Sequence, residues 1–145
     1  MRNCIKIIEF SMDMLNKLNT PVIICTEQKK ILQFVEGFSK VELNLVLAER
    51  LSKIDIDKRS LFVPEEFNNI LDEIDGKVYL TSFEILFNPS YQIDVIKLIV
   101  EASRKRKIIV HWCGSYVDGK LLFATNEFAD YHSYKIADYD ITCVI

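Results

Sequence analysis

A short group of polar residues, Thr81, Ser82 and Glu84, follows an apolar segment of the chain and has the make-up of a site at the end of a strand. The apolar residues 78–80 show no alternation with polar ones, which is typical of a strand buried on both faces of a parallel sheet. In many nucleotide-handling proteins such a strand ends in an acidic pair that holds a metal ion and activates water. Thr81 and Ser82 occupy that place here, which leaves Glu84 as the candidate general base and Thr81 as a candidate nucleotide contact.

A second candidate site, for a phosphate group, follows the apolar run 22–25. A phosphate-binding loop at this place needs glycines, whose positive φ angles form a nest of backbone amides, and a Lys beside a Ser or Thr. Residues 26–30 contain no glycine, and Glu27 places negative charge where a phosphate would bind. Lys29 or Lys30 could still reach a phosphate, although two lysines that open a helix usually form a solvated face.

A cationic stretch is the third candidate site. Four consecutive residues form a possible nucleic-acid or partner patch: Arg104, Lys105, Arg106 and Lys107. A helix carboxyl terminus attracts cations through its dipole alone, which is the simpler interpretation. The net charge of -3 indicates no general affinity for nucleic acid, so any contact with DNA would be local or indirect. A weaker alternative is a small nuclease or nucleic-acid-binding protein that combines this patch with Asp118 and Lys120.

Composition limits the class of protein. A chain of 145 residues with 50% hydrophobic residues and few glycines or prolines predicts one compact domain, residues 1–145. The four cysteines are isolated from one another without the spacing of zinc ligands, so we expect free thiols and no metal site. No run approaches the roughly 20 apolar residues of a membrane span, and Glu9 and Asp13 do not suit a signal peptide. We therefore expect a cytoplasmic protein without membrane contact.

The periodicity of apolar residues predicts alternating helices and strands. Helices are expected at 5–18, 31–38, 48–54, 63–75 and 92–105, and strands at 22–25, 41–47, within 77–89, at 108–112 and at 141–145. Asp118 and Gly119 between apolar residues predict a β-hairpin over 116–123. The order predicts an α/β fold of three layers, a mainly parallel sheet flanked by helices, with a β-hairpin region at the carboxyl end.

Three residues with aromatic rings, two histidines and the tryptophan, lie in or near the predicted strands. His111 lies within an apolar strand, which favours a hydrogen-bonded core histidine over a catalytic one. Trp112, the single tryptophan, is expected to be an anchor in the core or at an interface. His132, between polar and aromatic neighbours, is expected on the surface.

Residues 78 to 134 combine a strand ending in an acidic motif, a helix, a basic patch, a Trp-containing turn and a Tyr-rich segment. The residues that form this pattern are Glu84, Ile85, Leu86, Phe87, Trp112, Gly114, Asp118, Gly119 and Tyr131 to Tyr134. In these residues the chain resembles the BrxF family, small P-loop-type proteins of BREX bacteriophage-defence systems. The Asp of the family's motif corresponds to Thr81. The resemblance implies an AAA-like core that binds ATP and serves phage defence beside larger DNA-modifying partners.

This chain departs from that pattern in the residues that would bind nucleotide. The phosphate loop, its Lys-Ser/Thr pair and the magnesium-binding Asp are absent at the matching places, which removes most of the stabilisation that phosphoryl transfer needs. The resulting hypothesis is a non-hydrolysing scaffold or regulatory subunit that needs no cofactor and binds other protein subunits of a defence complex, with a homo-oligomer possible. The alternative is an ATPase that uses ATP and magnesium, Lys29 or Lys30 for phosphate, and Glu84 as general base.

Overall fold

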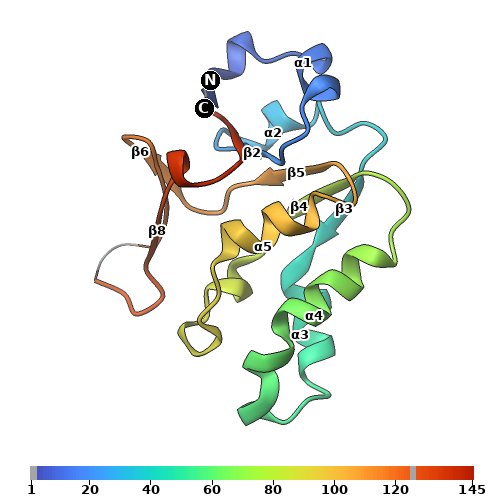
Figure 1. The fold of residues 1–145 in the computed structure, drawn as a ribbon, viewed down its shortest axis with the longest axis vertical. Coiled ribbons are helices and arrows are strands. Elements are labelled where there is room, and N and C mark those ends of the chain that lie inside the picture. The colour runs from blue at the N-terminus through green and yellow to red at the C-terminus, as the bar shows by residue number, and fades with distance from the viewer. Residues whose placement is uncertain (1–2, 125–126) are drawn as a thin grey trace.

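The fold contains two β-sheets, and helices cover both faces of the larger one (Figure 1). The structure is a computed structural model that describes residues 3–124 and 127–145. The larger sheet has six parallel strands in the order β1-β9-β2-β5-β4-β3. Their bounds are β1 Cys4–Ile5, β2 Val22–Ile24, β3 Ser39–Glu42, β4 Val78–Thr81, β5 Ile108–His111 and β9 Thr142–Val144. The smaller, antiparallel sheet consists of β6 Ser115–Val117, β7 Lys120–Phe123 and β8 His132–Lys135.

Helices form the outer two of three layers. Their bounds are α1 Met12–Lys17, α2 Gln28–Ile31, α3 Leu43–Leu51, α4 Arg59–Asp72 and α5 Val95–Ala102. Single 3₁₀ turns connect them: η1 Ile7–Glu9, η2 Ile56–Lys58, η3 Glu84–Phe87, η4 Pro89–Tyr91 and η5 Ile136–Asp138. In Figure 1, α1 and α2 lie on one side of the parallel sheet and α3, α4 and α5 on the other. The predicted three-layer α/β class is confirmed. Among the described residues, no helix combines the length and the apolar character that crossing a membrane requires.

The central strands β2, β4 and β5 are buried on both faces, as their unbroken apolar sequences predict. Only His111, at the end of β5, is less than fully buried among their residues. Successive side chains of a strand point to opposite faces, and β4 illustrates the result. Val78 and Leu80 join the core under α3, α4 and α5, whereas Tyr79 joins the core under α1 and α2.

The two ends of the described chain meet in the parallel sheet. Strand β9 lies between β1 and β2, with Cys4 opposite Cys143, and the termini lie side by side in Figure 1. The prediction of one helix over 5–18 is therefore wrong in its first part. Helix α1 begins only after Ser11, whose Oγ accepts a hydrogen bond from the Met14 amide. Pairing across the whole length of the chain outweighs the local helical spacing.

Other predicted elements also differ from the structure. The helix expected at 31–38 is absent, because α2 ends at Ile31 and Gly37 has a φ of 81°. The strand expected at 41–47 stops at Glu42, where α3 begins. The helix expected at 92–105 is shorter, since the Asp94 side chain caps α5 and the helix ends at Ala102. The predicted opening of α4 is also wrong, because the helix starts one and a half turns before Pro64.

The Asp-Gly hairpin is confirmed, and it stands beside an aromatic cluster. Asp118 and Gly119 have φ angles of 47° and 78°, the left-handed pair that a two-residue hairpin requires. The cluster joins the small sheet to the larger one through side chains of Phe83, Phe87, Trp112, Phe123 and Tyr134. Trp112 is buried, as predicted, and its Nε1 donates to the carbonyl oxygens of Ser115 and Leu122. The small sheet therefore packs as part of the same core.

Candidate functional site at the carboxyl edge of the sheet

The candidate site lies where the parallel strands β2, β5 and β4 end. Parallel strands deliver their carboxyl ends to one edge of a sheet, where α/β proteins commonly bind ligands. Thr26 follows β2, His111 ends β5 and Thr81 ends β4, with Glu84 just beyond. Ile24 and His111 are direct neighbours in the register of β2 and β5. The residues singled out after β4 and β5 therefore lie at one edge of the sheet, as the parallel arrangement predicts.

Glu84 is held in place by Asn44. The residue opens η3 and is exposed, and the Asn44 Nδ2 donates a hydrogen bond of 2.5 Å to its Oε2. The Asn44 Oδ1 in turn accepts a bond of 2.8 Å from the Ile85 amide. The Asn44 amide donates to the Ser82 carbonyl at 2.7 Å. The amide side chain at the start of α3 therefore orients the only carboxylate of this segment and closes the turn after β4.

The backbone at this turn is unusual. Ser82 has a φ of 51°, a left-handed conformation that residues other than glycine rarely adopt. Such conformations cluster at functional sites and persist where the surroundings enforce them. The hydrogen bonds from Asn44 supply that enforcement here.

His111 and Cys113 lie close enough to Glu84 for their pKa values to respond to it. Burial lowers the pKa of His111, against the opposing effects of a hydrogen bond to the Thr26 backbone and the Glu84 charge. Burial also raises the pKa of the Cys113 thiol, and the Glu84 carboxylate raises it further. His111 and Cys113 are therefore both neutral near pH 7. A neutral thiol is a poor nucleophile, which argues against covalent catalysis at Cys113.

Thr81, the candidate nucleotide contact, is buried. It ends β4 opposite Glu42 of β3 and has an exposed fraction of 7%. A hydroxyl in this position is poorly placed to meet magnesium or a phosphate. Thr26, on the opposite side of β5, has a buried Oγ1 without a hydrogen-bond partner in the described part of the chain.

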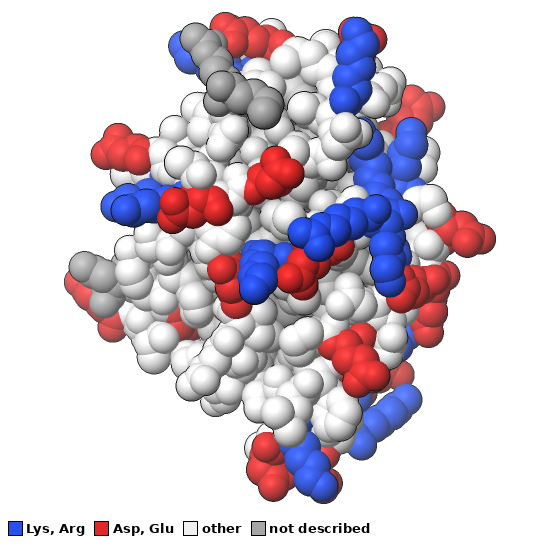
Figure 2. Space-filling model, viewed as in Figure 1, with Lys and Arg blue, Asp and Glu red and all other residues white. Residues whose placement is uncertain are grey.

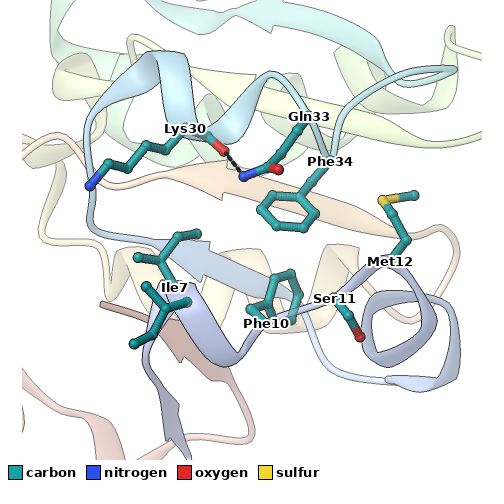
Figure 3. A pocket seen from close by; sticks show the side chains of 8 residues that line it. Ile7, Phe10, Ser11, Met12, Lys30, Gln33 and Phe34 are labelled. Carbon is teal, nitrogen blue, oxygen red and sulfur yellow. Dashed lines mark hydrogen bonds between the residues drawn. The ribbon is translucent and has the colours of Figure 1, made fainter.

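Lys29 and Lys30, the candidate phosphate contacts, are exposed on α2. Lys30 lines a pocket of about 490 Å³ together with residues of η1 and the start of α1, and Figure 3 shows it above Ile7. In the same view the rings of Phe10 and Phe34 meet edge to face, 5.0 Å apart. This pocket lies on the face covered by α1 and α2, whereas Glu84 is bonded to α3 on the other face. Lys30 and Glu84 thus belong to different sides of the sheet.

The basic stretch is bound largely within the molecule. Figure 2 shows Lys and Arg side chains gathered near the end of α5 with acidic side chains beside them. Arg106 donates to Asp72 at 2.5 Å, and the Lys105 Nζ lies 3.9 Å from the same carboxylate. Lys107 donates to the carbonyl oxygens of Leu15 and Leu18 at the end of α1. Arg104 is exposed and remains available to a partner.

Two further predicted residues lie away from this edge. Asp118 and Lys120 are on the β6–β7 hairpin, whereas the basic stretch connects α5 to β5. His132, expected on the surface, is half-buried, because its ring stacks on Tyr134 and its Nδ1 bonds to the Asp130 carbonyl. The structure therefore supplies no shared site for the nuclease alternative among the residues proposed for it.

Sequence reasoning missed Asn44 as a site residue. The surrounding apolar residues, Leu43 to Leu47, predicted a continuous strand and concealed the start of α3. The available signal was a single amide inside an otherwise apolar run. Thr26 and Cys113 were missed as site members as well, although both directly follow predicted strands whose carboxyl ends converge in a parallel sheet.

The described side chains at this edge can orient a bound group and exchange protons with it. Glu84 is the one carboxylate on the segment after β4, and no group of three or more His, Cys, Asp and Glu side chains within residues 3–124 and 127–145 is placed to hold a metal ion. Comparison of the chain with models of protein families, with curated proteins and with solved structures finds no match.

Proposed function

We propose that the protein is a P-loop-derived, non-hydrolysing scaffold or regulatory subunit of a bacterial anti-phage defence complex. The BrxF-like residues described above supply the link to defence. The order of strands supports the P-loop part of the proposal. Within the parallel sheet, five strands lie side by side in the order β9-β2-β5-β4-β3. When these strands are renumbered 1 to 5 along the chain, the order becomes 5-1-4-3-2, which is the strand order of AAA-like cores. This likeness of strand order is an analogy of fold, and the activity of such a fold depends on the residues at its site.

The loss of hydrolysis rests on one observation, the geometry of the segment between β2 and α2. This segment is where a P-loop protein wraps the phosphates with backbone amides at the start of a long helix. Helix α2 has four residues, and the residue before it is Glu27, whose carboxylate would repel a phosphate. A chain that keeps the sheet and lacks the phosphate cradle can still present its surface to partners.

The second element of a hydrolytic site is also missing. Thr81 stands where the metal-binding carboxylate of β4 would lie and is buried. Glu84 is engaged by Asn44 rather than free to activate water. Without a metal ligand and a phosphate cradle, developing charge on a transferring phosphoryl group would not be stabilised.

The proposal is tested by measuring nucleotide binding and hydrolysis with purified protein. We expect isothermal titration of ATP with magnesium to give no binding heat, and phosphate release to equal the rate of buffer alone. ATP hydrolysis that Glu84→Gln abolishes would overturn the non-hydrolysing role and favour the ATPase alternative. Lys29→Ala together with Lys30→Ala is the matched test of the phosphate contacts, and Lys53→Ala, an exposed lysine after α3, is the control.

The role in a complex is tested separately in cells. A tagged chain, expressed beside its neighbouring genes, should co-purify with other subunits, and phage protection should be lost when the gene is deleted and kept in Glu84→Gln. Protection that depends on Glu84 would contradict a scaffold role.

A further inference from the structure

Strand β3 is one of the two edge strands of the parallel sheet, and its backbone is open to pairing on one side. Strand β3 is the last in the order β1-β9-β2-β5-β4-β3, and it pairs only with β4 within the described residues. The Ser39 amide donates to the Lys77 carbonyl, so the backbone of Ser39 faces β4. Because successive residues of a strand present their backbone groups to opposite sides, the N–H groups of Lys40 and Glu42 and the Lys40 carbonyl face outward. An exposed edge of this kind is a template for pairing with another chain.

An apolar groove runs beside this edge. A pocket of about 510 Å³ is bounded by β3, α3 and the end of α4, and its apolar lining consists of Val41, Leu45, Val46, Ile70 and Ile74. Leu45 is 74% exposed and Val46 is 39% exposed, although both belong to a helix that packs on the core. Large apolar side chains next to a free edge indicate a surface that another chain covers.

The charges on β3 favour a second copy of this chain as the occupant. Lys40 and Glu42 lie on one side of the strand with Val41 between them, and their charged groups are 3.3 Å apart. If two copies of β3 pair antiparallel about a two-fold axis at Val41, Lys40 of each copy lies opposite Glu42 of the other. Opposite charges placed directly across an antiparallel pair stabilise it. The strand is therefore complementary to itself, which a symmetric dimer requires.

The backbone fits the same arrangement. The outward Glu42 amide of each copy can donate a hydrogen bond to the outward Lys40 carbonyl of the other copy. The two Val41 residues face each other at the axis and form a non-hydrogen-bonded pair, because their backbone groups point toward β4. The axis also brings Leu45 and Val46 of the two copies toward each other on the face that carries the groove. We infer that the protein forms a two-fold dimer through β3, which joins two parallel sheets into one continuous sheet and covers the groove of each copy. This inference does not depend on the proposed function.

The test exchanges the charges on β3 and measures the mass of the protein by sedimentation velocity between about 2 and 200 µM. The wild-type protein should show a concentration-dependent dimer. Lys40→Glu places Glu opposite Glu, and Glu42→Lys places Lys opposite Lys, so each should weaken the dimer roughly tenfold or more. The double exchange, Lys40→Glu with Glu42→Lys, should restore it.

A mixture of the two single variants gives the sharpest result. A Lys40→Glu chain paired with a Glu42→Lys chain again has opposite charges at every crossing, so the mixture should form a heterodimer that neither variant forms alone. Lys17→Glu and Asp13→Lys are the matched controls, because they break an exposed ion pair of 3.0 Å on α1 with the same changes in net charge. They should leave the dimer unchanged, and circular dichroism should show that all variants are folded.

Three results would each overturn the inference. A wild-type protein that stays monomeric over the whole range has no such dimer, whether or not a foreign peptide binds the groove. A dimer that both single variants leave intact uses another surface. A mixture of the single variants that stays monomeric shows that the charges do not meet across the axis.

Discussion

The contact between Asn44 and Glu84 links residues that are forty positions apart and defines the carboxyl edge of the sheet. The Asn44 side chain donates a hydrogen bond to the Glu84 carboxylate and accepts one from the backbone N–H of Ile85. It therefore orients Glu84 and also stabilises the turn at Ser82. Asn44 therefore has a structural role in the turn and a chemical role in orienting the carboxylate. Its two roles can be separated by experiment.

Replacement of Asn44 should destabilise the protein. In Asn44→Ala the Ile85 amide loses its partner while part-buried, so the free energy of unfolding in urea should fall by about 1–2 kcal/mol. Asn69→Ala, an exposed asparagine on α4, is the control and should change stability by less than about 0.5 kcal/mol. Equal effects of the two substitutions would show that the hydrogen bonds of Asn44 contribute nothing.

His111 should make the protein less stable as the pH falls. Burial lowers the pKa of His111 in the folded protein, so below about pH 6.5 the unfolded chain binds a proton that the folded chain does not. The contribution of His111 is thus present above its unfolded pKa and is lost as the pH falls toward its folded pKa. Unfolding in urea, measured from about pH 8 to pH 5.5, should show a smaller decline for His111→Gln than for wild type. Parallel curves would contradict the assignment.

At the scale of elements, Gly114 lies between β5 and the β6–β7 hairpin, at a place where the backbone leaves no room for a side chain. A Cβ built on Gly114 would lie 1.8 Å from the Leu122 carbonyl oxygen, whereas one on Gly37 meets nothing within 4 Å. The chain after Trp112 must therefore pass directly beside β7. Only glycine permits this approach.

Substitution at these two glycines separates steric overlap from backbone strain. Gly114→Ala should lower the free energy of unfolding by at least about 3 kcal/mol, because the strand β7 or the turn itself has to move. Gly37→Ala, with open space and a φ of 81°, should cost only about 1 kcal/mol. A Gly114→Ala protein as stable as Gly37→Ala would show that the turn can shift freely.

The accuracy of prediction from sequence also differed by element. Strands β2, β4 and β5 were predictable because unbroken apolar, β-branched runs suit only a buried position in a parallel sheet. Strand β1 was not, because its partner β9 lies about 140 residues away and no local pattern marks the pairing. The helix predicted at 31–38 was wrong because a local pattern was present but misleading. The apolar residues of this region have helical spacing, yet they pack on the core without forming a helix.

The same distinction applies to the site. Thr81 and Glu84 were located because they follow a strand that was correctly predicted. Asn44 required knowledge of where β3 ends and α3 begins, and a run of apolar residues hides that boundary. The engagement of Lys107 by the end of α1 could not be read from the cationic stretch, because its acceptors are backbone carbonyls far away in the sequence.

At the scale of the whole molecule, the two faces of the parallel sheet carry different features. One face bears α1, α2 and the pocket beside Lys30, and the other bears α3, α4 and α5, with the groove at β3 next to α3 and α4. The proposed dimer would leave the first face and the carboxyl edge open. A subunit with this arrangement can therefore pair with itself and still bind other proteins.

The position of β9 also dictates when the sheet can be completed during synthesis. Residues 142–144 form the strand between β1 and β2, so β1 has no partner in the sheet until these residues have left the ribosome. Until then, β1 cannot join the sheet, and β2 is exposed as an edge strand in its place. A chaperone that shields nascent chains would therefore meet an incomplete sheet in the interval between the emergence of β5 and that of β9.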